Sequence, residues 1–221
     1  LVDVMARHNR GIFQIGPDVA SGAAHKTFLD RLQKVAVDSG RPVMFGTLST
    51  RQGVDPLPWQ SQMQYLDDTA DAGGRIFGQT TTRPIIALFS VQSYLPFNNL
   101  PAWRELRELP IQEQERRFAD PGIRRALVAD ESGMKTRDNT FQGGGAATTD
   151  PKKPDYTNLY ALKGVDWDDP TVDQLSRMRG QHPVEVMLDL MIENEDQLFV
   201  QPLVNETPED VLGMLLHPRT L

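Results

Sequence analysis

Four polar residues occur where a short apolar run is interrupted or has just ended. Gln14 and Gln79 each lie inside such a run, Arg83 comes four residues after Gln79 and directly before Pro84, and Asn205 follows a later run. A glutamine amide in a buried strand needs a hydrogen-bond partner, from the protein or from a ligand. An arginine can hold a carboxylate through two parallel hydrogen bonds. We therefore predict substrate-orienting roles for these residues: Gln14, Gln79, Arg83 and Asn205.

Each of these residues also has a structural alternative. An inter-strand hydrogen bond would satisfy either glutamine, and a salt bridge to an acidic residue would occupy Arg83. Polar loops also follow strands in proteins that bind no ligand there. The residue types alone do not decide between these alternatives.

No complete catalytic set can be assembled from the chain. The four histidines lack the paired spacing of metal ligands, and three of them stand beside predicted helix ends: His8, His25, His182 and His217. The acidic pairs Asp67-Asp68 and Asp168-Asp169 are typical of turns or helix starts. The glycines 143–145 follow no predicted strand, so they do not form a phosphate-binding loop. We assign no metal ligand and no catalytic residue within these 221 residues.

Short apolar runs alternate with amphipathic stretches, which predicts parallel strands joined by crossover helices. The predicted strands are 11–15, 42–48, 75–80 and 198–204, and helices are predicted over 23–39 and from Trp59 to Leu66 and beyond. Functional groups in such folds gather at the carboxyl ends of the strands. The residues there, nearly all of them polar, are Gln14, Pro17 and Asp18, then Thr47, Ser49, Thr50 and Arg51, then 79–83, and finally Asn205 and Glu206.

The regular alternation stops after the third predicted strand. Residues 84–197 have no clear strand pattern and form a predicted helical insertion, with helices over 103–109, 111–119, 120–131, 170–179 and 183–194. Within it, 132–158 is rich in Gly, Thr, Asp, Lys and Pro and is predicted to be a flexible loop.

The amino-acid composition argues against two classes of binding partner. The chain has 23 Lys and Arg against 30 Asp and Glu, for a net charge of -7, and shows no basic stripe, so we expect neither nucleic acid nor an anionic membrane surface as a partner. No apolar run approaches the roughly 20 residues of a membrane helix. The absence of cysteine is compatible with a cytoplasmic protein.

Both ends of the sequence have the pattern of segments from the interior of a domain. Residues 1–5 read as the last turns of a helix, and Thr207 with Asp210 reads as the capping pair of a final helix that Pro218 ends. The residues after Pro218 read as the approach to a further strand. We therefore interpret the chain as an internal piece of a larger protein.

Several segments together resemble the N-acyl-D-amino-acid deacylase (D-aminoacylase-like) branch of the amidohydrolase superfamily. They are Arg10-Gly11-Ile12-Phe13-Gln14, Gln79-x-x-x-Arg83-Pro84, Leu100-Pro101-Ala102-Trp103-Arg104-Glu105-Leu106, Asp120-Pro121 and Leu216-His217-Pro218-Arg219-Thr220-Leu221. Apart from 132–158, the resemblance spans most of the chain.

The resemblance implies a fold and an activity. It implies a partial (β/α)8 TIM-type barrel with a helical insertion, in which a divalent metal, usually zinc, activates water to cleave the amide bond of an N-acyl amino acid. The first-strand His-x-His and the Ser-Asp-x-Gly-Ala-His motif with the catalytic aspartate would lie outside this chain, so the isolated piece is expected to be inactive.

One departure from the family pattern supports a second hypothesis. Typical members place metal-binding histidines on two middle strands, where this chain has Gln14 and Thr47-Leu48-Ser49. The alternative is a non-catalytic barrel that binds a small molecule or a protein partner.

Overall fold

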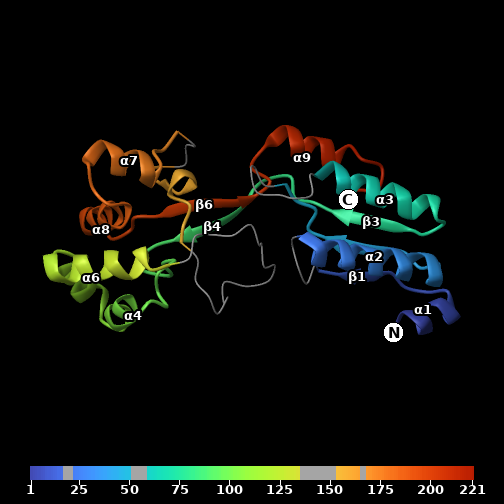
Figure 1. Cartoon of the computed structure of the whole chain (residues 1–221), viewed down its shortest axis with the longest axis horizontal. Helices are drawn as coiled ribbons and strands as arrows, with labels where there is room; N and C mark the ends of the chain where they lie inside the picture. The colour runs from blue at the N-terminus through green and yellow to red at the C-terminus, as the bar shows by residue number, and fades with distance from the viewer. Residues whose placement is uncertain (17–21, 51–58, 135–152, 165–167) are drawn as a thin grey trace. The chain divides into compact units, whose positions relative to one another are not determined.

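The computed structural model describes residues 1–16, 22–50, 59–134, 153–164 and 168–221 (Figure 1), and of residues 22–25 only the backbone. The chain forms two compact units. Unit 1 comprises the described residues of Leu1–Ile85 and Leu203–Leu221. Unit 2 comprises the described residues of Ile86–Asp138 and Thr148–Pro202.

Unit 1 is built on a parallel sheet with the order β1-β2-β3. The strands are β1 (Phe13–Ile15), β2 (Val43–Gly46) and β3 (Ile76–Gln79). Phe13 pairs with Val43, and Val43 with Ile76, so the apolar residues of the three strands stand in one row. The predicted parallel strands at 11–15, 42–48 and 75–80 are confirmed with slightly shorter bounds.

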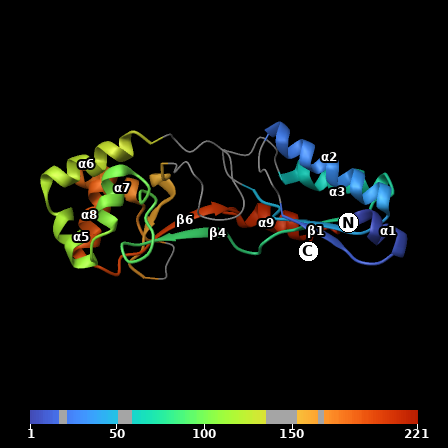
Figure 2. The same ribbon diagram turned by 90° about the horizontal axis from the view of Figure 1, so that it is seen from below.

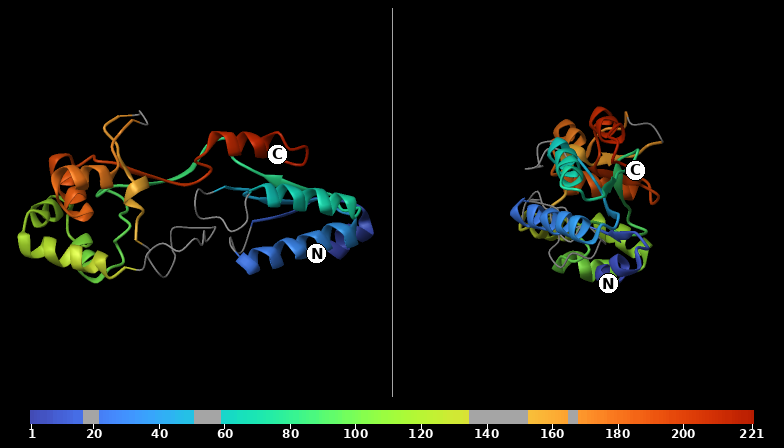
Figure 3. Two further views of the ribbon diagram at one scale, coloured as in Figure 1. Left: turned by 45° about the horizontal axis from the view of Figure 1, so that its top comes forward. Right: turned by 90° about the vertical axis from the view of Figure 1, so that its right-hand side faces the viewer.

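The helices of unit 1 share one core with one face of this sheet. They are α2 (Gly22–Ser39), α3 (Trp59–Asp71) and α9 (Pro208–Leu215), which follow α1 (Val2–His8) at the amino end. Figure 2 shows α2 and α3 side by side on the same side of the strands, and Figure 3 shows α9 beside α3. Leu32 of α2, Leu66 of α3 and Met214 of α9 are buried in the same apolar cluster as the strand residues.

A fourth parallel segment extends this sheet at the carboxyl end. Thr220 forms a parallel bridge with Gly78, and the backbone N–H of Leu221 donates to the Gly78 carbonyl at 2.9 Å. The expected approach to a strand after Pro218 is therefore confirmed. Strand order and chain order agree across the sheet, and a helix precedes each added strand.

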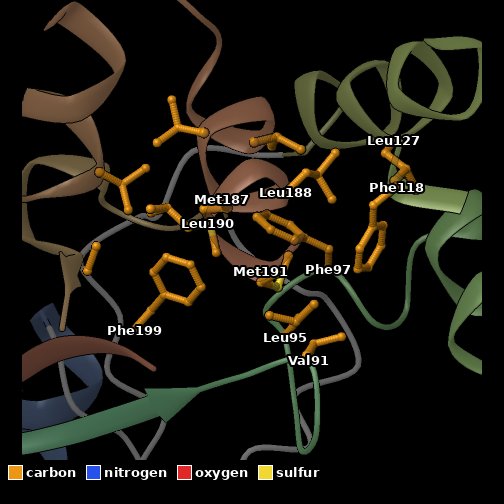
Figure 4. Close-up of a cluster of buried hydrophobic side chains, with 14 of the residues drawn as sticks. Val91, Leu95, Phe97, Phe118, Leu127, Met187, Leu188, Leu190, Met191 and Phe199 are labelled. Atoms are coloured by element: carbon orange, nitrogen blue, oxygen red, sulfur yellow. The ribbon is translucent and has the colours of Figure 1, made fainter. Parts of the chain in front are cut away.

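Unit 2 is mostly helical. Its helices are α4 (Pro101–Arg107), α5 (Ile111–Phe118), α6 (Pro121–Ser132), the short 3-10 helix η1 (Tyr156–Asn158), α7 (Val172–Arg179) and α8 (Pro183–Glu193). These confirm the helices predicted between 103 and 194, including the start that Asp120 caps by accepting from the N–H groups of Gly122 and Ile123. In Figure 4, Phe97 and Phe118 point toward Met187, Leu188 and Met191 of α8 in one closed core.

A second small sheet has the order β4-β6-β5. Its strands are β4 (Ile85–Phe89), β5 (Tyr160–Ala161) and β6 (Phe199–Val204). Tyr160 and Val200 pair in an antiparallel ladder. The chain passes from unit 1 to unit 2 within β4 and returns within β6.

Three expectations are wrong. The segment 84–197 does contain strands, β4 and β5. The strand predicted at 198–204 exists, but it lies in this second sheet, antiparallel to β5, rather than in the parallel sheet. Thr207 stands at the N-cap of α9 without a side-chain capping hydrogen bond, and Asp210 turns to other partners.

The described residues show no closed barrel. Residues 135–152 of the predicted flexible loop lie outside the described part of the chain, whereas 153–158 are placed, with Tyr156 buried. Among the described helices, none is both long and apolar enough to cross a membrane.

Candidate functional site

The described helices α2, α3 and α9 pack on one face of the sheet of unit 1, and we call the opposite face the open face. Phe13 and Ile15 pack against the helical core, so Gln14 between them points to the other side. The pairing places Met44 beside Gln14 and Phe77 beside Met44 in one row across this side. Gln14 is exposed, and Met44 and Phe77 are half-buried. The open face therefore carries a row of apolar side chains, and polar side chains lie near the carboxyl ends of its strands.

The structure brings Gln14 and Gln79 together across β2. The amide Nε2 of Gln14 donates to Oε1 of Gln79 at 3.0 Å. The intervening strand residue is Gly46, where a Cβ would lie 3.0 Å from the Cβ of Gln79 and 3.3 Å from its Oε1. A larger residue at 46 would push Gln79 away, so this glycine makes room for the amide pair.

The Gln14–Gln79 pair retains free hydrogen-bonding atoms. Among the described residues, Gln14 Oε1 and Gln79 Nε2 have no protein partner. If both amides were turned over, the pair would still present one acceptor and one donor. The inter-strand hydrogen bond and a ligand-binding role are therefore compatible.

Asn205 joins three strand ends. Its backbone is left-handed, with φ 62°, and it is buried. Its Oδ1 accepts from the Thr50 N–H at 3.0 Å, and its Nδ2 donates to the hydroxyls of Thr81 at 2.9 Å and Thr80 at 3.4 Å. The whole amide is thus occupied by protein groups.

Arg83 lies in the loop between β3 and β4 with an exposed side chain. Its guanidinium forms no ion pair or hydrogen bond with any described residue, so the salt bridge offered as the structural alternative is not seen there. Its carbonyl accepts from the Thr81 hydroxyl at 2.7 Å. Two further charged residues expected near the strand ends, Asp18 and Arg51, lie outside the described ranges.

Asp210 is a site residue that the sequence did not reveal. Its Oδ1 accepts from the indole N–H of Trp59 at 2.9 Å, and its Oδ2 lies 3.4 Å from the Thr50 hydroxyl. The partners are 151 and 160 residues away in the chain. In sequence, Asp210 has only the appearance of a first-turn helix residue, so no local signal points to this contact.

A charged cluster occupies the stretch around the last parallel segment. His217 Nε2 lies 3.2 Å from Oδ2 of Asp67, and Arg219 Nε donates to Oδ1 of the same carboxylate at 3.2 Å. The hydrogen bond to His217, followed by the charges of His217 and Arg219, lowers the pKa of Asp67 below its usual value despite some opposing desolvation. These contacts connect α3 to the segment that follows α9, and they occupy His217 Nε2 with the Asp67 carboxylate.

Unit 2 contains a buried polar cluster of another kind. Glu131 is fully buried, and its Oε1 accepts from the Tyr156 hydroxyl at 2.7 Å and pairs with Lys153 Nζ at 2.9 Å. Burial, with the charge of Glu131, raises the pKa of Tyr156 strongly. His182 caps α8 through Nδ1, which accepts from the Val184 N–H, as its predicted place beside a helix end suggested.

The described residues do not fit a metal site. Within the described ranges, no three His, Asp or Glu side chains gather closely enough to hold a metal ion. The polar groups that the structure describes on the open face and at its strand ends include amides, hydroxyls, one arginine and the carboxylates of Asp210 and Glu206. The chemistry that these groups support is binding and orientation of a polar ligand.

Comparison with protein-family models, with curated proteins and with solved structures gives no match to the chain.

Proposed function

We propose that the chain is part of a metal-dependent amidohydrolase that cleaves the amide bond of N-acyl amino acids. The observation that carries this proposal is the one-sided winding of unit 1. The strands follow one another in chain order, while α2, α3 and α9 pack on one face. A doubly wound sheet reverses its strand order and has helices on both faces, whereas successive strands with helices on one side are the repeating unit of a (β/α)8 barrel.

In such a barrel, the open face of unit 1 would line the interior. Gln14 and Gln79 would orient the ligand amide through the free acceptor of the first and the free donor of the second. The N–H and C=O of a trans amide point in opposite directions, so a linear N-acyl amino acid would engage one of these atoms at a time. Arg83 would hold the carboxylate, and the half-buried Met44 and Phe77 would face an apolar group.

The metal, by this proposal zinc, would activate the attacking water and stabilise the oxyanion. Its ligands and the catalytic aspartate are assigned to residues outside this chain, and no catalytic step is assigned to the described residues. Asn205 remains a predicted site residue, although its occupied amide favours a supporting role over ligand contact.

The second candidate is a non-catalytic barrel that binds a similar small molecule. The absence of histidine at Gln14 and at Thr47-Leu48-Ser49, where typical family members place metal ligands on two middle strands, favours it. The two candidates share the binding surface and differ in hydrolysis.

The test begins with the coding DNA on both sides of Leu1 and Leu221. The proposal expects a His-x-His motif upstream and a Ser-Asp-x-Gly-Ala-His motif downstream. The protein encoded by the complete reading frame should then release free amino acid from N-acetyl-D-amino acids when zinc is supplied, and stop when zinc is chelated. Absence of both motifs, or binding without hydrolysis under all metal conditions, would reject the hydrolase and leave the binding protein.

A further inference from the structure

We propose that Asn205 is a positioning residue that holds the backbone of Arg83 through Thr81, so that the arginine is fixed for a ligand carboxylate. This inference rests on the proposed function, which gives Arg83 its role as the carboxylate-binding residue. It differs from the original prediction for Asn205, which placed the amide itself against substrate.

Asn205 is anchored firmly to the end of the sheet. Its backbone N–H donates to the Thr50 carbonyl at 2.8 Å, and its Oδ1 accepts from the Thr50 N–H at 3.0 Å. Two hydrogen bonds to one residue fix both the position and the rotation of the asparagine. Because the side chain is also buried, its Nδ2 group has a defined direction.

Two successive hydrogen bonds, which we call the relay, connect Asn205 to Arg83 through the Thr81 hydroxyl. Asn205 Nδ2 donates to the Thr81 hydroxyl at 2.9 Å, and that hydroxyl donates to the Arg83 carbonyl at 2.7 Å. A hydroxyl has one proton, so a donor on its lone pair leaves the proton for the carbonyl. Hydrogen bonds in such a chain strengthen one another.

Pro84 restricts the backbone conformation of Arg83. A residue before proline is largely confined to extended backbone. With its carbonyl also held by Thr81, Arg83 has a fixed Cα–Cβ direction although its side chain is exposed. Fixing the start of the side chain reduces the entropy that the guanidinium loses when it binds a carboxylate.

The test compares a charged ligand with its neutral counterpart. The probes are N-acetyl-D-leucine and N-acetyl-D-leucinamide, with the L enantiomers in parallel, and their dissociation constants are measured by NMR titration of the full chain. The wild type should prefer the carboxylate by up to about fivefold, the range of an exposed ion pair. Arg83→Gln should abolish this preference.

Thr81→Val removes the hydroxyl that connects Asn205 to Arg83 and nearly preserves the shape of the side chain. It should abolish the preference for the carboxylate. The Thr81→Val/Arg83→Gln double variant should bind the carboxylate no more weakly than either single variant. Thr81→Ser should restore the preference, since it retains the hydroxyl. The matched control is Thr82→Val, an exposed neighbour that should bind both probes as the wild type does.

The two possible failures are distinguishable. If Arg83→Gln abolishes the preference and Thr81→Val keeps it, or if Thr81→Ser fails to restore it, the positioning inference is overturned while the role of Arg83 stands. If the wild type shows no preference for the carboxylate, the role of Arg83 in the proposed function fails, and the inference fails with it.

Discussion

The two units place their polar groups differently. In unit 2, Oε1 of the buried Glu131 accepts from Tyr156 and pairs with Lys153, whereas Oε2 forms no hydrogen bond and lies 3.6 Å from His182 Nε2. A closed aromatic and aliphatic core surrounds the helices. In unit 1, Gln14, Gln79 and Arg83 lie on an open face or in an exposed loop and retain atoms without protein partners in the described residues. Polar groups enclosed in a core act on the fold, whereas exposed groups with free donors and acceptors can reach a ligand. We therefore propose ligand binding for unit 1 and a structural role for the buried polar cluster of unit 2.

The largest expected effect is the separate destabilisation of unit 2. Trp103 is fully buried, its ring centroid lies 4.6 Å from that of Phe97 in a tilted arrangement, and its indole N–H donates to the Leu127 carbonyl at 3.2 Å. Trp103→Ala should lower the free energy of unfolding of unit 2 by about 3–5 kcal/mol. Hydrogen exchange should show lost protection in α4, α6 and α8 and unchanged protection in β1–β3.

The matched control for this change is Met178→Ala, at a largely exposed position of α7. It should leave exchange unchanged in both units. Equal loss of protection in the two units of Trp103→Ala would mean that they unfold as one body, and the comparison would lose its basis.

A smaller effect is expected in unit 1 at Asn205. Asn205→Ala would leave the buried Thr50 N–H without its acceptor and would put alanine, which tolerates left-handed backbone less well than asparagine, at φ 62°, so the free energy of unfolding of unit 1 should fall by about 2–3 kcal/mol. Asn205→Gly should recover about 1 kcal/mol of this, since glycine adopts positive φ freely. Urea unfolding followed by exchange in β2 and β3 measures both variants. Equal stabilities of the two would show that backbone conformation contributes nothing there.

The smallest effect is a pH dependence at Asp67. Its pKa in the folded state lies below the ordinary 3.8, first because of the hydrogen bond to His217. The stabilisation is therefore present above pH 3.8 and is lost as the pH falls through the lower folded pKa. The urea midpoint of unit 1 should fall more steeply below pH 4 in the wild type than in Asp67→Asn, by a small amount because the carboxylate is half exposed. Asp71→Asn, on the exposed end of the same helix, should retain the wild-type slope; identical slopes for wild type and Asp67→Asn would contradict the role of the cluster.

Local signals predicted the elements well and their pairing poorly. Asp120-Pro121 and His182-Pro183 begin helices because caps and N1 prolines act within a few residues. The strand at 198–204 was recognised by its apolar run, but its partner in β5 lies about 40 residues away and leaves no trace in that run. β4 was missed because its five residues follow directly on Arg83-Pro84, which marks a loop.

The candidate site was predictable in residue type only. The interruption of two strands by Gln14 and Gln79 identified a pair that does meet, because parallel strands align their carboxyl ends. Asn205 has a left-handed backbone and bonds to Thr80 and Thr81, which precede it in the chain by 125 and 124 residues. Such long-range contacts decide whether a polar side chain is free or occupied, and the sequence does not contain that information locally.

We propose that the open face of unit 1 binds the amide of a ligand, and an NMR titration of the full chain with N-acetyl-D-leucine tests this binding. Shifts are expected at Gln14, Gln79 and Arg83, with none in α4–α8. Gln79→Ala should abolish the shifts, whereas Gln64→Ala, an exposed glutamine of α3 bonded only to Asp68, should leave them unchanged. Shifts that map to unit 2, or that persist in Gln79→Ala, would contradict the account.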